Sequence, residues 1–185
     1  LLKISRYYLQ MSSAKEVSIL ALHGFTGCSE DFLGFSNKCK FVSNWFCPNL
    51  PGHHGGVDCG VDKIKCDPES TRKYLQNYIK EVSPKPKFLL GYSMGARAAL
   101  HLALATPSKW QALILISPNP GIKKENDRKM RREEDSKLAN RLEVEGTASF
   151  IKRWKETPLI KSQKSIRAEW RKRMQKSREQ HSSLG

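Results

Sequence analysis

The sequence predicts an α/β protein, in which a parallel sheet is covered by helices on both faces. Three apolar runs carry this prediction: "VSILALHGF" (17–25), "KFLLGYS" (87–93) and "ALILISPNPG" (112–121). Continuous apolar runs of this length are typical of strands buried on both faces, and segments of helical period separate them. None of the runs approaches the ~20 residues that a membrane-spanning helix needs, so no membrane span is predicted.

The other core elements fall between these strands. A short helix is expected over 31–39, and segment 41–56 is expected to be a second strand that runs into a Pro/Gly loop. Segment 67–82 predicts a helix because its opening "DPE" supplies a capping carboxylate, a proline for the first helical position and an early acid. The alanine-rich segment 94–107 predicts another helix, which its terminal proline ends.

The composition of the sequence changes after Gly121. Charged residues dominate the C-terminal third, and three helical segments are expected there, at 122–145, 147–160 and 165–180. No further buried strand is recognisable. We therefore expect two parts, with residues 1–121 as the α/β core and residues 122–185 as an incomplete helical cap segment.

The chain carries a net charge of +15, and nine of these charges arise after residue 120. Such a basic segment attracts either nucleic acid or a small polyanionic substrate. The basic residues alternate with acids, as in "KKENDRKMRREED", and no RNA-binding signature or zinc-finger spacing accompanies them. Most of these side chains are therefore expected to form a solvated helical face, and no nucleic-acid partner is expected.

The cysteines number five, and none forms a C-x-x-C pair; they are Cys28, Cys39, Cys47, Cys59 and Cys66. An odd number without this spacing favours reduced thiols over a disulfide framework or a zinc site. The N-terminal "LLKISRYYLQM" lacks the apolar core of an export signal, since basic residues interrupt it. Both observations predict a cytoplasmic protein without a bound metal.

The stretch "GYSMG" (91–95) matches G-x-S-x-G, the pattern of a nucleophilic serine on a tight strand-to-helix turn. It lies between a predicted buried strand and a predicted helix, which is the context that this turn requires. We expect glycines at both ends because side chains there would collide with neighbouring elements. Ser93 is therefore the candidate catalytic residue, and the backbone N–H of Met94 faces the same point at the positive end of the helix dipole.

A second donor for an oxyanion hole is expected from the loop after an earlier strand. The stretch "LHGFTG" (22–27) is suited to this role, because Gly24 permits close approach and the N–H of Phe25 can point at a substrate oxygen. His23 is expected to hold the loop instead of acting as a base. It precedes the serine, whereas the catalytic histidine of this fold follows it.

Together these features resemble the α/β-hydrolase fold. The stretches "LHGFTGCSEDF", "PNLPGHHGG", "LLGYSMGARAALHLAL", "ALILISPNPGI" and "LANRLEVEGTASFIKRWKETPLI" further resemble one family within it. That family is the synthase of menaquinone and phylloquinone biosynthesis that makes 2-succinyl-6-hydroxy-2,4-cyclohexadiene-1-carboxylate. The likeness runs from about residue 17 to the end of the sequence. One departure is "GHHGG", where the family usually has a single histidine between the glycines.

The resemblance implies a lyase that eliminates pyruvate from 2-succinyl-5-enolpyruvyl-6-hydroxy-3-cyclohexene-1-carboxylate without metal or organic cofactor. Ser93 would be the base, and the Phe25 and Met94 N–H groups would hold the developing enolate. A substrate with three carboxylates needs cations, and arginine binds carboxylates with two parallel hydrogen bonds. Arg97, one helical turn after Ser93, matches the arginine of the family motif. The remaining substrate-binding candidates are Tyr92, Arg128, Arg173 and Trp154, the last of which suits either a pocket wall or the core of the cap.

Partners for Ser93 are harder to find in the sequence. His101 is too far to reach Ser93, because it lies about 12 Å along the helix that starts at the serine. A triad histidine or acid of this fold follows a strand, whereas His181 follows none and the acids Asp127 and Asp135 lie in the charged segment. We therefore expect a chain that stops inside the cap, lacks the closing strands, and is inactive or nearly so in this form. Two other functions stay open: an ester or thioester hydrolase, and a non-catalytic basic interaction protein.

Overall fold

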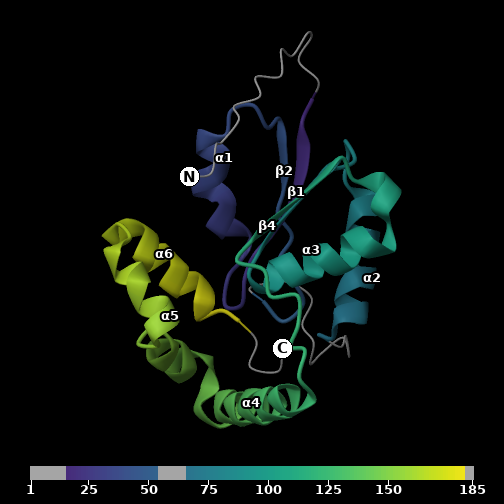
Figure 1. Cartoon of the computed structure of the whole chain (residues 1–185). Helices are drawn as coiled ribbons and strands as arrows, with labels where there is room; N and C mark the ends of the chain where they lie inside the picture. The colour runs from purple at the N-terminus through teal and green to yellow at the C-terminus, as the bar shows by residue number, and fades with distance from the viewer. Residues whose placement is uncertain (1–15, 54–65, 182–185) are drawn as a thin grey trace, which may run out of the picture.

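The computed structural model describes residues 16–53 and 66–181 (Figure 1). Its centre is a parallel sheet of four strands in the order β2-β1-β3-β4. The strands are β1 (Ser18–Leu22), β2 (Asn44–Phe46), β3 (Phe88–Tyr92) and β4 (Ala112–Ile116). The predicted α/β class and parallel sheet are confirmed.

Strand β1 is buried along its whole length, because helices cover both faces of the sheet beside it. Leu20 and Leu22 point into a core with Leu75 and Leu102, which come from the helices α2 (Pro68–Glu81) and α3 (Met94–Ala105). Ile19 and Ala21 point to the opposite face, where Phe32 packs. In Figure 1, α2 and α3 lie on one side of the sheet and α1 (Leu33–Lys38) lies on the other.

The helix α2 begins as the sequence predicts. The Asp67 carboxylate accepts hydrogen bonds from the N–H groups of Glu69 and Ser70, both at 2.9 Å, and Pro68 occupies the first helical position. Three short 3₁₀ turns also connect the elements: η1 (Ser29–Phe32), η2 (Pro107–Lys109) and η3 (Ser162–Ser165). The turn η2 starts at Pro107, and α3 ends two residues before it, as expected.

Strand β4 differs from the prediction of a strand buried on both faces. Its residues alternate between half-buried and exposed, and Ile114 and Ile116 are exposed while Leu113 and Leu115 pack against the core. The reason is position: β4 is the edge strand of the described sheet, and α3 covers only one of its faces. An apolar run indicates a strand, but it does not say whether both faces are covered.

The basic C-terminal part is helical, as expected, in three helices: α4 (Glu125–Trp154), α5 (Pro158–Lys161) and α6 (Ala168–Arg178). Gly146 breaks α4 with a φ of 74°, a conformation that suits glycine, so the expected boundary near residue 146 is a kink. Charged side chains of α4 pair along its exposed surface, as Arg131 does with Asp135 at 2.8 Å. The solvated helical face is thus present. No helix among the described residues is long and apolar enough to cross a membrane.

The cysteines only partly match the expectation of free thiols. Cys28, Cys39 and Cys47 are free, but Cys66 is disulfide-bonded, so the prediction is wrong for that residue. Cys59 lies outside the described residues. The count and spacing of cysteines carry no information on which loops bring two sulfur atoms together, and this is why the sequence did not reveal the bond.

Candidate active site

Ser93 sits on a strained turn between β3 and α3. Its φ of 52° and ψ of −112° are rare for a residue with a side chain, and such a conformation costs on the order of 1–3 kcal/mol. The surrounding structure holds it in place: the Ser93 N–H donates to the Ile116 carbonyl at 2.9 Å, and its own carbonyl accepts from the N–H of Ala96 at 3.0 Å. Strain of this kind is typical of functional residues and matches the predicted turn.

The two glycines beside the serine are required by close packing. A Cβ at position 91 would lie 2.5 Å from the Cα of Ala96, and one at position 95 would lie 2.5 Å from the carbonyl carbon of Leu22. Real Cβ atoms do not come so close to backbone atoms. Gly91 and Gly95 therefore let β3, α3 and the end of β1 meet at the serine, as the sequence pattern indicates.

The loop after β1 runs directly against this turn. A Cβ on Gly24 would lie 3.4 Å from the Cβ of Ser93, and the Gly27 N–H closes a tight turn onto the Gly24 carbonyl at 2.9 Å. The N–H groups of Phe25 and Met94 make no hydrogen bond within the described part of the chain. Two unused backbone donors from adjacent segments are suited to hold an anionic oxygen.

His23 holds the loop, as expected from its place before the serine. The ring is buried, its Nε2 accepts a hydrogen bond from the Leu50 N–H at 3.0 Å, and its Nδ1 lies 2.9 Å from the Gly24 carbonyl. Because Nε2 accepts, Nδ1 is the protonated nitrogen and donates to that carbonyl. The interactions of His23 thus stabilise the loop that contains Phe25.

Two aromatic rings of α4 contact Phe25, whose side chain stays partly exposed. Its ring packs edge-on against Trp154 at 5.4 Å and Phe150 at 6.3 Å between centroids, and those two rings stack on each other at 5.8 Å. The Trp154 Nε1 is buried and has no hydrogen-bond partner among the described residues. Trp154 therefore lies beside the loop of the candidate oxyanion hole, which favours the pocket-wall alternative.

Two histidines extend this cluster. The ring centroid of His53 lies 5.0 Å from that of His23 and 5.0 Å from that of His181. The His53 and Phe25 rings meet edge to face, with 6.2 Å between their centroids. His53 belongs to the "GHHGG" stretch, and its neighbour His54 lies outside the described residues. The doubled histidine is visible in the sequence, but nothing in the pattern predicts that His53 joins the loop after β2 to the residues that follow α6.

This cluster predicts a pH-dependent stability. Burial lowers the pKa of His53 below its ordinary value of 6.5, while a hydrogen bond to Pro51 opposes the shift. The unfolded chain therefore takes up a proton near pH 6.5 that the folded chain resists, so stability is fully present above pH 6.5 and decreases as the pH falls below it. We expect the urea midpoint to fall more steeply with acidification in the wild type than in His53→Gln. Parallel pH profiles of the two proteins would contradict this expectation.

The structure separates the predicted arginines. Arg97 is exposed one turn into α3, and its N–H donates to the Ser93 carbonyl at 3.3 Å. Arg128 is turned back onto the start of α4, where its guanidinium donates to the carbonyls of Ile122 and Lys123 at 2.8 and 2.7 Å. Arg173 is exposed, with its guanidinium 5.5 Å above the Trp170 ring. Of the three, Arg97 lies nearest in sequence to Ser93. It is exposed in the first turn of the helix that follows the serine.

Arg178 lies at the candidate site, and the sequence did not single it out. It is only 7% exposed, and its Nε donates to the Thr26 carbonyl at 3.2 Å, in the loop that carries Phe25. Burial lowers the pKa of its guanidinium, and the nearby Asp31 carboxylate opposes that shift. The preceding Ser177 also donates to the Cys28 sulfur at 2.9 Å, so the end of α6 is fixed to this loop. Several arginines crowd residues 165–180, and no signal in the sequence singles out Arg178.

A parallel sheet with a serine on a strained strand-to-helix turn, facing a second loop with free N–H donors, defines an α/β-hydrolase. The family described as serine aminopeptidase, S33 (Hydrolase_4) matches residues 16–183, and the chain belongs to this family. The structure of MenH from S. aureus has a TM-score of 0.79 and 27% identity, covering 96% of this chain and 65% of that one.

Two curated relatives are similar in sequence. A putative 2-succinyl-6-hydroxy-2,4-cyclohexadiene-1-carboxylate synthase from Bacillus subtilis is 28% identical over 168 residues, which are 91% of this chain and 61% of that protein. Protein PHYLLO, chloroplastic, from Arabidopsis thaliana is 31% identical over 152 residues, 77% of this chain and 9% of that protein. The chain thus spans about three fifths of the bacterial relative and a small part of the plant one.

Proposed function

We propose that this chain carries the nucleophile turn and the substrate-binding cap of a synthase of menaquinone or phylloquinone biosynthesis, which eliminates pyruvate to form 2-succinyl-6-hydroxy-2,4-cyclohexadiene-1-carboxylate. The observation that carries the proposal is that Ser93, on its strained turn, lies against the Phe25 loop, which in turn contacts Trp154 of α4. The similarity to proteins bearing that name supports it.

In the proposed reaction, the Ser93 oxygen removes the ring proton next to the succinyl ketone. The electron pair moves onto the ketone oxygen, and the N–H groups of Phe25 and Met94 stabilise the resulting enolate. When the enolate collapses, a double bond forms between C2 and C3, the ring double bond shifts to C4 and C5, and the C5–oxygen bond breaks. Pyruvate leaves as its enol form, which takes the proton from Ser93 and tautomerises. Ser93 takes up one proton and returns it, and the reaction involves no net oxidation or reduction, so the elimination needs no oxidant or reductant.

The carboxylates of this substrate would pair with cations around the serine. We assign one to Arg97 and another to Arg178, which lies against the Phe25 loop. Tyr92, half-exposed with its ring against Gly24, would lie next to the substrate, and Trp154 would form a wall.

Arg128 and Arg173 remain weaker candidates, because the guanidinium of Arg128 is hydrogen-bonded to the start of its own helix and that of Arg173 packs on Trp170.

The serine itself needs activation. Among the described residues no hydrogen bond joins the Ser93 hydroxyl to a histidine, and the expected lack of a triad partner stays a prediction. The division into core and cap and the cytoplasmic location also stay predictions. The plant relative carries the word chloroplastic in its name, so the location is best tested directly by fractionation.

Arg97→Ala is expected to raise KM for the enolpyruvyl substrate by about 10- to 100-fold, the range for a lost charge-assisted hydrogen bond. The melting temperature should change little, since Arg97 is exposed. His101→Ala, one turn further along α3, is the matched control and should leave the kinetics unchanged. Equal kinetic parameters for Arg97→Ala and wild type would show that Arg97 is a surface residue only.

A hydrolase is the competing function, because the matching family is named for a serine peptidase. A hydrolase would use Ser93 as a covalent nucleophile and accumulate an acyl-enzyme. Mass spectrometry of the protein mixed with chromogenic esters separates the two functions. A hydrolase should show an acyl group on Ser93. A lyase that uses Ser93 as a base should remain unmodified during turnover of its own substrate.

A further inference from the structure

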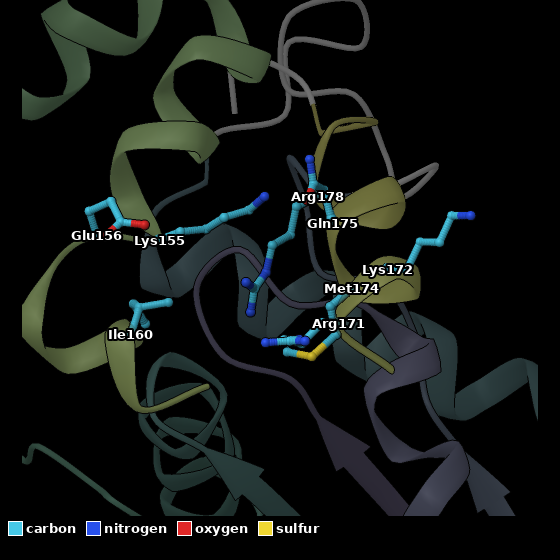
Figure 2. Close-up of a pocket in the computed structure, with 8 residues that line it drawn as sticks. All are labelled: Lys155, Glu156, Ile160, Arg171, Lys172, Met174, Gln175 and Arg178. Carbon is cyan, nitrogen blue, oxygen red and sulfur yellow. The ribbon is translucent and has the colours of Figure 1, made fainter. Parts of the chain in front are cut away.

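A cavity of about 300 Å³ lies between the end of α4, α5 and α6. Figure 2 shows its lining, which consists of Lys155, Glu156, Ile160, Arg171, Lys172, Met174, Gln175 and Arg178. Four of these residues are cations and one is an acid. An unbalanced group of cations around a cavity favours an anionic ligand.

Lys155 is the cation of this group that comes from the end of α4. Its ammonium makes no hydrogen bond or ion pair with the residues that the structure describes. Burial lowers its pKa, with Arg178 adding to this shift while Glu179 and Glu156 oppose it. In Figure 2 the Lys155 side chain extends across the cavity toward Arg178, whereas Lys172 points outward.

Arg178 connects this cavity to the candidate active site. It lines the cavity and also donates through Nε to the Thr26 carbonyl, one residue after Phe25. Arg171 lies about two turns earlier on α6 and also faces the cavity in Figure 2. A ligand whose carbonyl oxygen lies at the Phe25 N–H could therefore extend a short arm past Arg178 into the cavity.

We propose that Lys155, with Arg171, forms a separate subsite for the terminal carboxylate of the succinyl arm. The inference rests on the proposed function, in which the succinyl ketone lies in the oxyanion hole. The succinyl arm starts at that ketone and carries its carboxylate two methylene groups beyond it. The enolpyruvyl group is attached to the opposite side of the ring by a shorter linkage, so its carboxylate would point away from this subsite.

The test compares two stable probes by calorimetry with the full-length protein. The compound 2-succinylbenzoate contains the arm with its terminal carboxylate, and 2-butanoylbenzoate has the same ketone without that carboxylate. We expect the wild type to bind the succinyl probe about 10-fold more tightly or better, as for one charge-assisted hydrogen bond. Lys155→Ala should remove this preference and leave the affinity for the butanoyl probe unchanged.

Two variants make the result specific. Lys155→Arg keeps the charge and should keep the preference, and Lys152→Ala removes an exposed lysine one turn earlier on α4 and should change neither affinity. The proposal fails if Lys155→Ala affects both probes equally, if Lys152→Ala has the same effect, or if the wild type does not distinguish the probes. Binding needs no turnover, so a protein that prefers the succinyl probe but releases no pyruvate would refute the reaction and retain the subsite.

Discussion

Ser93→Ala is expected to lower kcat for pyruvate release by about 10³-fold, within the range that a positioned general base contributes. The reason is that the Ser93 oxygen is the group proposed to take the ring proton, and the strained turn serves to present it. Substrate affinity should be nearly retained, because the carboxylate-binding arginines are untouched. The assay is steady-state pyruvate release with the full-length protein.

The control for this experiment is Ser108→Ala, which alters an exposed serine in η2. It should have wild-type kinetics. A Ser93→Ala protein that is folded and releases pyruvate at more than a tenth of the wild-type rate would exclude Ser93 as the base. A protein with lost affinity but retained kcat would instead place Ser93 in substrate binding.

Gly95→Ala is expected to destabilise the fold by about 3 kcal/mol or more, at the upper end of the effects of overpacking. The added methyl group would lie 2.5 Å from the Leu22 carbonyl carbon, and the atoms in its way are backbone. They can yield only if β1 and α3 separate. The measurement is the urea unfolding midpoint together with the m-value.

Gly34→Ala is the matched control, since Gly34 lies in α1 and its added Cβ would meet only the Trp170 ring, at the ordinary contact distance of 3.8 Å. This variant is expected to be neutral or more stable by about 0.5–1 kcal/mol, because alanine loses less backbone entropy on folding than glycine. Equal stability of the Gly95→Ala and Gly34→Ala proteins would contradict the close packing described at the nucleophile turn.

The sequence predicted those features that local chemistry determines. Apolar runs located β1 and β3, "DPE" located the start of α2, and "GYSMG" located the turn whose glycines the packing requires. The pattern that predicts each of these features lies within a few positions of the sequence. The role of His23 in holding its loop was inferred differently, from its place before the serine in the chain, and the hydrogen bond that fixes its ring comes from Leu50, 27 positions away.

Features that depend on contacts between distant segments could not be predicted in this way. Arg178 meets Thr26 across 152 positions of sequence, and nothing local separates it from Arg171 or Arg173. The contact of His53 with His181 is of the same kind, since it joins residues that are far apart in the sequence. The exposure of β4 depends on the elements beside the strand, which its own apolar residues do not specify.

The central claim is that Ser93 acts in an elimination that releases pyruvate. The measurement that tests it most directly is the incubation of the full-length protein with 2-succinyl-5-enolpyruvyl-6-hydroxy-3-cyclohexene-1-carboxylate, with pyruvate and the cyclohexadiene product quantified together over time. We predict equimolar formation of both, dependent on Ser93 and without a covalent intermediate on the protein. Pyruvate release no faster than in buffer, combined with ester hydrolysis through acylated Ser93, would contradict the claim and identify a hydrolase.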